Sequence, residues 1–301
     1  MKKWQLLLVV IVAGLLTVPA QAGIINVLWY QGGTEQGAPG TYEANINTLA
    51  GLAPGAPGGN TWNVTYWNSG AMPAGTFNVL VVASPEGSWV TNPDYTSLNA
   101  AGLTFDPTAQ RLMLTGQDAD WHYQNGLPSP LTFNGPQGFL LDSINWAGSG
   151  TGMGLVALGQ TGSSFCNGGA ALGLGGYTPL CDSTESVNIP AAEAGFPINT
   201  GLTSAGLSNW STSSHTDFTG LSVNWNGINV DGGFDCSDPT TGKCDYVTIV
   251  SASSAGGGIG GTPEPSSILL LGTGLVGLIR YRRFWLRFAI HFPRASAVRH
   301  E

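Results

Sequence analysis

Phe77-Asn-Val-Leu-Val-Val-Ala83 is the strongest strand signal in the chain, a nearly continuous apolar run that ends at Ser84-Pro85. Strands that are buried on both faces, as at the centre of a parallel sheet, have this composition. Hydrophobic periodicity and Gly/Pro breaks predict further elements on both sides of it. In chain order these are strand 24–30, helix 42–52, strand 62–67, helix 95–103, strand 111–115, helix 135–147 and strand 154–158.

This alternation of strands and helices predicts an α/β fold built on a doubly wound parallel sheet. In element order, residues 24–160 resemble flavodoxin-like and class I glutamine-amidotransferase-like proteins. The chain contains neither G-x-C-x-G nor G-x-S-x-G, so the resemblance implies a fold and not the amidotransferase chemistry. Residues 161–250 are rich in Gly, Ser, Thr and Asn, and we expect them to form a β extension with strands at 221–230 and 246–251. An all-β sandwich is the alternative.

The C-terminal forty residues contain three consecutive features of a sorting signal. Pro263-Glu264-Pro265 precedes the apolar run 268–279, which is followed by Arg280-Tyr281-Arg282-Arg283. Together they resemble the PEP-CTERM sorting signal of exported bacterial proteins. The resemblance implies that a membrane-embedded exosortase recognises and cuts the chain here, and that the protein belongs to the envelope or the extracellular polysaccharide matrix.

The apolar run of this signal is short for a permanent membrane helix. A spanning helix takes about 20 apolar residues, and residues 268–279 supply 12. The arginines that follow would stay in the cytoplasm by the positive-inside rule. We therefore expect a transmembrane segment that anchors the chain transiently in the inner membrane, with an ordinary C-terminal anchor as the alternative. Residues 284–301 extend beyond the point where such signals end, as an interfacial tail or a gene-boundary artefact.

The N-terminus carries an independent export signal. Met1-Lys2-Lys3 is basic, residues 6–18 are apolar, and Ala20-Gln21-Ala22 is a small-x-small cleavage site. This pattern predicts a secretory signal peptide that signal peptidase removes after Ala22. The predicted organisation is signal peptide 1–22, exported globular domain 23–251, flexible Gly/Ser linker 252–262, sorting signal 263–283 and basic tail 284–301.

The exported part is acidic and sparsely charged. Between Gly23 and Thr262 two basic residues, Arg111 and Lys243, stand against 16 carboxylates, a net charge of −14. Nucleic-acid binding needs a cationic surface that displaces counterions, so this class of function is excluded. An acidic surface favours solubility and attracts divalent or organic cations.

Four cysteines, Cys166, Cys181, Cys236 and Cys244, lie in the second half of the exported part. An even number of cysteines outside the cytoplasm predicts disulfides. Local pairing, Cys166–Cys181 and Cys236–Cys244, is preferred among the three possible connectivities. A zinc site is the alternative, and it is disfavoured because the chain has no C-x-x-C.

The best candidate for chemistry directly follows the strand at 111–115. If Gln117-Asp-Ala-Asp-Trp-His122 is extended, Asp118, Asp120 and His122 point to one side, since side chains alternate. Two carboxylates and an imidazole suit acid–base catalysis of hydrolysis or a divalent metal. The alternative, which we favour, is that Asp118 or Asp120 caps a turn and that His122 is an ordinary polar partner.

Three further polar residues, Gln31, Ser84 and Glu86, follow neighbouring predicted strands. In a parallel sheet the carboxyl ends of the strands meet at one edge, where ligands of open α/β folds bind. We therefore expect these residues to converge on the same crevice as Asp118, Asp120 and His122, with Glu86 as a fourth candidate catalytic group.

A second acidic cluster surrounds the last two cysteines and consists of Asp231, Asp235, Asp238 and Asp245. Carboxylates suit calcium, although the spacing does not match an EF-hand. The alternative is that these residues form turns. No other cofactor is indicated.

Four of the ten tryptophans, Trp67, Trp89, Trp121 and Trp210, lie in or beside predicted loops. Aromatic faces stack on sugars, so carbohydrate binding is one interpretation, and burial in the core is the other. The two targeting signals and the lack of a recognised catalytic motif predict a non-catalytic cell-surface or matrix protein, with extracellular polysaccharide as a candidate partner. The alternative is a hydrolase-like, carbohydrate-binding or metal-binding domain with its site at the carboxyl ends of the strands.

Overall fold

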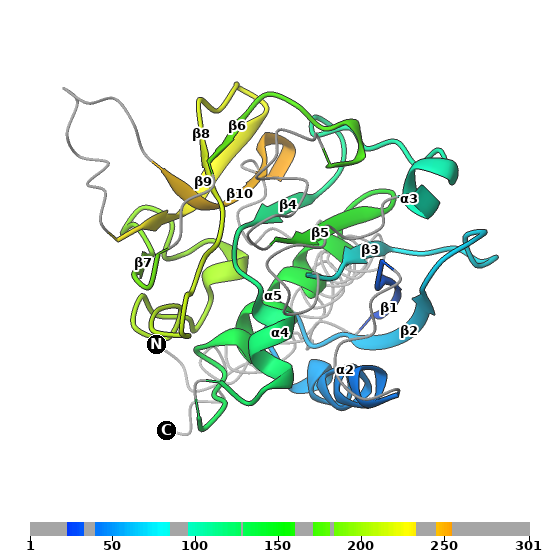
Figure 1. Ribbon diagram of the computed structural model, residues 1–301, viewed down its shortest axis with the longest axis horizontal. Coiled ribbons are helices and arrows are strands. Elements are labelled where there is room, and N and C mark those ends of the chain that lie inside the picture. The colour runs from blue at the N-terminus through cyan, green and yellow to red at the C-terminus, as the bar shows by residue number, and fades with distance from the viewer. Residues whose placement is uncertain are drawn as a thin grey trace, which may run out of the picture. The chain divides into compact units, whose positions relative to one another are not determined.

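The computed structural model describes residues 23–32, 40–84, 96–127, 129–159, 171–180, 184–232 and 245–254 (Figure 1). Contacts divide the chain into two compact units, Met1–Gly256 and Gly257–Glu301, and every described residue belongs to the first. Its elements are, in chain order, β1 (Ile24–Tyr30), α2 (Thr41–Leu52), η1 (Ala53–Gly55), β2 (Thr61–Trp67), β3 (Val79–Val82), α3 (Thr96–Ala100), β4 (Leu112–Thr115), α4 (Ala119–Gln124), α5 (Pro136–Gly148), β5 (Gly154–Leu158), η2 (Ala171–Gly173), β6 (Thr178–Leu180), β7 (Val187–Asn188), η3 (Pro197–Asn199), β8 (Asp217–Thr219), β9 (Trp225–Asp231), β10 (Tyr246–Ser251) and η4 (Ala252–Ser254).

All described strands form one sheet with a parallel half and an antiparallel half. Its main path is β2-β1-β3-β5-β4-β10-β8-β6, and β9 pairs with both β10 and β7. Strands β2, β1, β3, β5 and β4 run parallel, whereas every pair from β4–β10 onward is antiparallel. The predicted α/β class and the β extension are thus confirmed, and the all-β sandwich is wrong.

The order of the parallel strands differs from the predicted architecture. A flavodoxin-like sheet has the order 2-1-3-4-5, whereas here β5 lies between β3 and β4. The flavodoxin-like prediction is therefore not confirmed. Strand β4 is displaced to the border of the parallel half, where it pairs with β5 on one side and with β10 on the other. This position places the end of β4 next to the second half of the chain.

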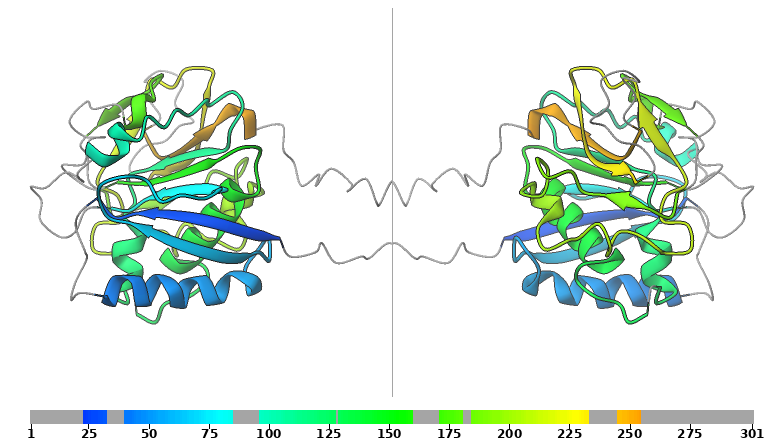
Figure 2. Two further views of the ribbon diagram at one scale, coloured as in Figure 1. Left: turned by 90° about the vertical axis from the view of Figure 1, so that its right-hand side faces the viewer. Right: turned by 90° about the vertical axis from the view of Figure 1, so that its left-hand side faces the viewer.

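The two faces of the sheet are covered differently (Figure 2). Helices α2 and α5 lie on one face, where strand residues such as Val27 and Trp29 pack against Ile46 and Phe139. The short helix α3 and irregular segments cover the other face, where Leu98 belongs to a second apolar cluster. Side chains alternate between the two faces along each strand, so the sheet separates two cores.

Most predicted elements of the first half are present, with boundaries shifted by a few residues. The main departures are a shorter helix α3, an additional helix α4 in the segment expected to be extended, and the short strands β6, β7 and β8. At the C-terminal end, Ala252–Ser254 still belong to the folded body as η4. Residues 252–254, which the sequence assigned to the flexible linker, therefore belong to the folded domain.

Several predictions fall on residues that the structure does not describe. These residues are Glu86, Trp89, Cys166, Cys181, Cys236, Cys244, Asp235, Asp238, the signal peptide and the sorting signal with its flanking tail. Among the helices that are described, none has the length and apolar character needed to cross a membrane. The run 268–279, on which the transmembrane prediction rests, lies outside the described residues.

Candidate functional site at the carboxyl edge of the parallel strands

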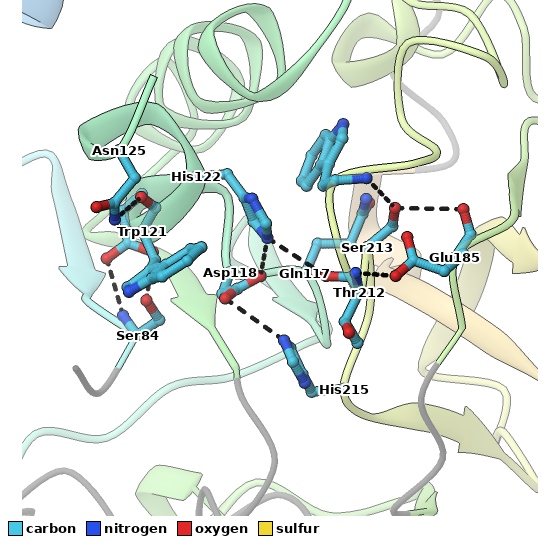
Figure 3. A network of polar contacts seen from close by, with 12 residues as sticks. Ser84, Gln117, Asp118, Trp121, His122, Asn125, Glu185, Thr212, Ser213 and His215 are labelled. Atoms are coloured by element: carbon cyan, nitrogen blue, oxygen red, sulfur yellow. Dashed lines mark hydrogen bonds and ion pairs between the residues drawn. The ribbon is translucent and has the colours of Figure 1, made fainter. Parts of the chain in front are cut away.

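Polar side chains collect where the parallel strands end (Figure 3). Gln31 follows β1, Ser84 lies two residues after β3, and Asp118 lies three residues after β4. All three are almost completely buried, with 2 %, 1 % and 3 % of their surface exposed. Because the strands are parallel, their carboxyl ends share one edge of the sheet, and the three residues lie at that edge without forming a single cluster.

The segment after β4 is not extended. Asp118 occupies the N-cap position of α4, and its side chain makes no capping hydrogen bond. Residues four apart on a helix are neighbours, so Asp118 and His122 contact each other whereas Asp120 points elsewhere. The predicted common side for all three residues is wrong, because that arrangement required a period of two. The predicted cap by Asp118 is wrong as well.

Asp118 lies between two imidazoles. Nε2 of His122 is 3.1 Å from Oδ1, and Nε2 of His215 is 3.5 Å from Oδ2. Nε2 of His122 also lies 3.3 Å from the carbonyl oxygen of Thr212. A carbonyl only accepts hydrogen bonds, so Nε2 of His122 carries a proton that it donates to Thr212. Figure 3 shows the two histidines approaching the carboxylate from different sides.

The two histidines set the charge state of Asp118. Burial alone raises the pKa of this carboxyl group, but hydrogen bonds and charge interactions from His122 and His215 outweigh that effect and hold the pKa below its ordinary value. Asp118 is therefore an ionised carboxylate at neutral pH, although only 4 % of its side chain is exposed.

Aromatic rings enclose His122. The ring of Trp121 meets it edge to face at a centroid distance of 4.9 Å, and Trp210 lies at 5.3 Å with a tilted ring. The imidazole is 1 % exposed, and its Nδ1 has no hydrogen-bond partner among the described residues. His215, with 11 % of its side chain exposed, is the most accessible of the three groups.

Asp120 faces a different set of partners. Its Oδ2 accepts hydrogen bonds from the hydroxyl of Tyr42 at 2.9 Å and from the backbone N–H of Ser84 at 3.0 Å, and its Oδ1 accepts one from the Ser84 hydroxyl at 2.6 Å. The indole N–H of Trp29 donates to the Tyr42 oxygen at 2.8 Å. These bonds connect β1, α2, the end of β3 and α4 through one carboxylate.

The environment raises the pKa of Asp120 to about 6. Complete burial is the main cause, and the negative charge of Asp118 adds to it, while the bonds from Ser84 and Tyr42 act in the opposite direction. The two oxygens accept three hydrogen bonds and have no exposed surface. This carboxylate therefore links α2, the end of β3 and α4, and we call it the Asp120 junction.

A glycine brings the histidine of the second half to the site. A Cβ on Gly116 would lie 1.8 Å from the carbonyl oxygen of Thr216, a separation that no side chain allows. The Gly116 carbonyl accepts a hydrogen bond from the N–H of His215 at 3.0 Å, and its own N–H donates to Val247 at 2.9 Å. Only glycine permits the segment around His215 to lie this close to β4.

The remaining predicted residues are dispersed or committed to other partners. Gln31 donates to the Glu43 carboxylate at 3.1 Å, away from the Asp118 cluster. Asp231 accepts a hydrogen bond from Thr184, and its N–H donates to the Asp245 carbonyl. Within the described ranges, no three His, Cys, Asp or Glu side chains are arranged to hold a metal ion. The calcium prediction also requires Asp235 and Asp238, which lie outside those ranges.

The tryptophans at the predicted loops differ in burial. Trp67 and Trp210 are buried, with 2 % and 1 % exposed, while Trp121 is half-buried beside Asp118 and Ser84 (Figure 3). The core interpretation therefore holds for Trp67 and Trp210. Trp121 is the one described tryptophan that retains accessible surface at the site.

Sequence reasoning missed four residues of this site: Tyr42, Gly116, Thr212 and His215. His215 sits in an irregular Ser/Thr-rich segment far from Asp118 in the chain, and no local pattern links the two. The glycine after the strand at 111–115 was the only available signal, because an isolated glycine at a strand end often marks a close backbone approach.

Comparison with known proteins identifies the C-terminal signal. The family model of the PEP-CTERM protein-sorting motif matches residues 262–283. No curated protein and no solved structure matches the chain. The chain thus carries a PEP-CTERM sorting motif, which marks it as an exported protein targeted to an exosortase.

Proposed function

We propose that this exosortase substrate delivers a single α/β domain to the cell envelope or the extracellular matrix, where the domain is a non-catalytic surface or matrix component. The sorting motif at residues 262–283 is the observation that carries the proposal. A signal peptide with cleavage after Ala22 starts the export, and the run 268–279 anchors the chain until the exosortase cuts near Pro263–Pro265.

The state of the predicted catalytic carboxylates supports a non-catalytic role. A general acid or base must come within hydrogen-bond reach of the group that it protonates or deprotonates. Asp120 has no exposed surface and its oxygens accept three protein hydrogen bonds. Asp118 lies between two imidazoles. Both carboxylates join distant parts of the chain, which is the role expected of groups that stabilise a domain.

The intact mass of the protein from the envelope and medium of its host tests the delivery. The expected product begins at Gly23 and ends near Pro263–Pro265. Replacing Arg280, Arg282 and Arg283 with alanine should cause the uncut C-terminus to accumulate. Replacing Arg287, Arg294 and Arg299, which lie beyond the matched motif, is the matched control and should leave processing unchanged. Retention of the segment through Arg283 in the unmodified protein would refute processing.

The Asp118–His215 contact favours a second candidate function, a hydrolase-like acid–base site. A carboxylate that orients an imidazole is the arrangement by which many hydrolases prepare a general base, and His215 is the most exposed member of the cluster. The test uses the secreted protein with nitrophenyl esters and nitrophenyl glycosides as probes. Hydrolysis that disappears in a folded His215→Gln variant would establish this function, and no hydrolysis by the unmodified protein would exclude it for these substrates.

Trp121 is half-buried beside the ionised Asp118, and this position supports carbohydrate binding as the way in which the domain contacts the matrix. Isothermal titration with the host's purified extracellular polysaccharide tests this partner. A Trp121→Ala variant that still binds equally well would place the contact elsewhere on the domain.

A further inference from the structure

Strand β2 lies at one border of the described sheet. Among the described strands it pairs only with β1, in parallel and in register along its whole length. Figure 1 shows β2 at the end of the sheet, with α2 beside it. The other side of β2 is therefore an edge at which a further strand of the described part of the chain is not bound.

Three residues of β2 direct their backbone groups toward this open edge. The N–H of Thr61 donates to the Gly23 carbonyl at 2.9 Å, and the Trp67 carbonyl accepts from the N–H of Gln31 at 3.0 Å. The odd-numbered residues of β2 thus bond to β1. The backbone groups of successive residues in a strand point to alternate sides of it. The residues that direct N–H and C=O groups to the open side are Trp62, Val64 and Tyr66.

The β2 edge lacks the features that normally prevent a strand from pairing with another chain. Natural edge strands are short, or they carry charges, proline or a bulge. Strand β2 has seven residues, Thr-Trp-Asn-Val-Thr-Tyr-Trp, without charge, proline or glycine, and it pairs with β1 without a bulge. At the other end of the main path, β6 has three residues and contains Pro179. One border of the sheet is thus protected, and the β2 border is not.

The β2 edge is also accessible and held in place. On the sheet face opposite to the long helices, Asn63 is exposed and Thr65 is partly exposed. On the helix-covered face, the Trp62 indole N–H donates to a side chain of α5 at 2.7 Å, and the Tyr66 hydroxyl donates to a carbonyl of α2 at 2.9 Å. These bonds fix the strand, so its open backbone groups form an ordered template.

The sequence of β2 complements itself in antiparallel pairing centred on Val64. In this register Val64 lies opposite the partner's Val64, and Trp62 lies opposite the partner's Tyr66. On the other face, Asn63 lies opposite the partner's Thr65. Pairs of β-branched or aromatic residues stabilise a sheet, whereas like charges opposite each other destabilise it. None of these pairs is charged, and each outward-directed residue meets an outward-directed residue of the other copy.

Charge restricts where two copies of this acidic domain approach each other. Between Gly23 and Thr262, two basic residues stand against 16 carboxylates, so two copies repel each other over most of their surfaces. We propose that β2 is a self-association edge, at which a second copy of this chain pairs antiparallel about a two-fold axis at Val64. A two-fold contact of this kind uses the same patch on both copies. The pairing does not depend on export or on the sorting motif.

The pairing determines how the two candidate sites of a dimer are placed. Antiparallel contact at β2 reverses one parallel half of the sheet relative to the other. The carboxyl edge of one copy therefore lies on the side of the joined sheet where the other copy has its amino edge. The two Asp118–His215 contacts are then directed to opposite sides, so one dimer presents its sites to two separate partners.

Sedimentation of the full-length chain in detergent micelles tests the pairing, over about 1 to 100 μM, a range suited to a weak interface. Two double variants at the exposed face of β2 probe the register. Asn63→Lys with Thr65→Lys places lysines opposite each other across the axis. Asn63→Lys with Thr65→Glu, the matched control, places opposite charges there. Circular dichroism first shows that both variants keep the unmodified secondary structure.

The unmodified chain should dimerise. The double-lysine variant should need about tenfold more protein or higher to dimerise, because two like-charged pairs form about the axis, and the lysine–glutamate variant should restore the dimer. A monomer at every concentration in the unmodified chain would overturn the proposal. Equal association of all three proteins would place the contact on another surface, and failure of the lysine–glutamate variant to restore the dimer would refute this register.

Photo-crosslinking gives a test that needs no charged variant. A photoreactive residue replaces Asn63 in one protein and Thr178, exposed in the protected strand β6, in the other. Position 63 should give a product of twice the mass, joined to residues 64–66 of the second copy, and position 178 should give none. A double-mass product from position 178 alone would refute the β2 edge as the site of self-association.

Discussion

Nε2 of His215 lies 3.5 Å from Oδ2 of Asp118, and this contact joins the parallel half of the sheet to a segment of the second half. Nε2 of His122 lies 3.1 Å from the other carboxylate oxygen, Oδ1. One buried charge thus connects β4, α4 and the segment before β8. Leaving a buried charge unpaired is costly, so the stability of the domain should depend on this carboxylate and on its protonation.

Asp118→Asn should lower the free energy of unfolding at pH 7 by roughly 1–3 kcal/mol, because the imidazoles lose a charged acceptor. The pKa of Asp118 is held below its ordinary value in the folded state. Its contribution to stability is therefore full above the pKa of the unfolded chain and is lost as the pH falls through the folded pKa. Urea unfolding between pH 7 and pH 3 should show a steeper loss for the unmodified protein than for the variant. If the free energy of unfolding falls equally with pH in the unmodified protein and in the variant, the charge of Asp118 does not stabilise the domain.

Tyr42→Phe should destabilise the domain by about 1–3 kcal/mol, since it removes a donor to buried Asp120 and the acceptor of the Trp29 indole N–H. Tyr66→Phe is the matched control. The Tyr66 hydroxyl contacts the Glu43 carbonyl and Asn47 at a half-exposed position, where water can replace the lost partners. Thermal unfolding by circular dichroism measures both variants. A larger shift for Tyr66→Phe would show that the Asp120 junction is not a main source of stability.

Gly116→Ala should cost roughly 2–4 kcal/mol or prevent folding, because the new methyl group would overlap the Thr216 carbonyl. The loss should include the His215–Asp118 contact, since the backbone of His215 is held by Gly116. Gly51→Ala is the control: the position lies in α2 with no atom within 4 Å of the added carbon, so alanine should stabilise by about 0.5–1 kcal/mol. Equal stability of the two variants would refute the close approach.

Local sequence patterns were sufficient to find most helices and strands of the first half. The strand at residues 154–158 and the long helices were predicted closely because they bury continuous apolar runs or one apolar face. The position of β5 between β3 and β4 was not predictable, since periodicity reports burial and carries no information on strand order. Helix α4 was missed because six residues are too few to separate a period of 3.6 from a period of 2.

The candidate site was only partly predictable for the same reason. Asp118, Asp120 and His122 were found because they follow a recognisable strand, but their division between two networks depends on the helical conformation of α4. His215 and Tyr42 reach the site through tertiary packing, from segments far from α4 in the chain. Such pairings are visible only once the sheet is assembled.

Asp142 should give the stability of the domain a pH dependence opposite to that of Asp118. This residue lies in α5, which is buried along its whole length, and its Oδ1 has no partner among the described residues. Burial raises the pKa of Asp142 to about 8. The folded state therefore holds a proton that the unfolded chain releases at an ordinary carboxyl pKa near 4, so stability should fall as the pH rises from about 4 to 8.

Asp142→Asn keeps the neutral shape of the protonated side chain and should remove this dependence. The variant should be more stable than the unmodified protein at pH 8, and the difference should disappear near pH 4. Asp106→Asn is the control, since Asp106 is exposed and its carboxylate accepts hydrogen bonds from Thr108 within its own turn. Melting temperatures at pH 4, 6 and 8 decide the question. If Asp142→Asn destabilises most at pH 8, the carboxylate is charged and has a partner in the fold, and the neutral assignment fails.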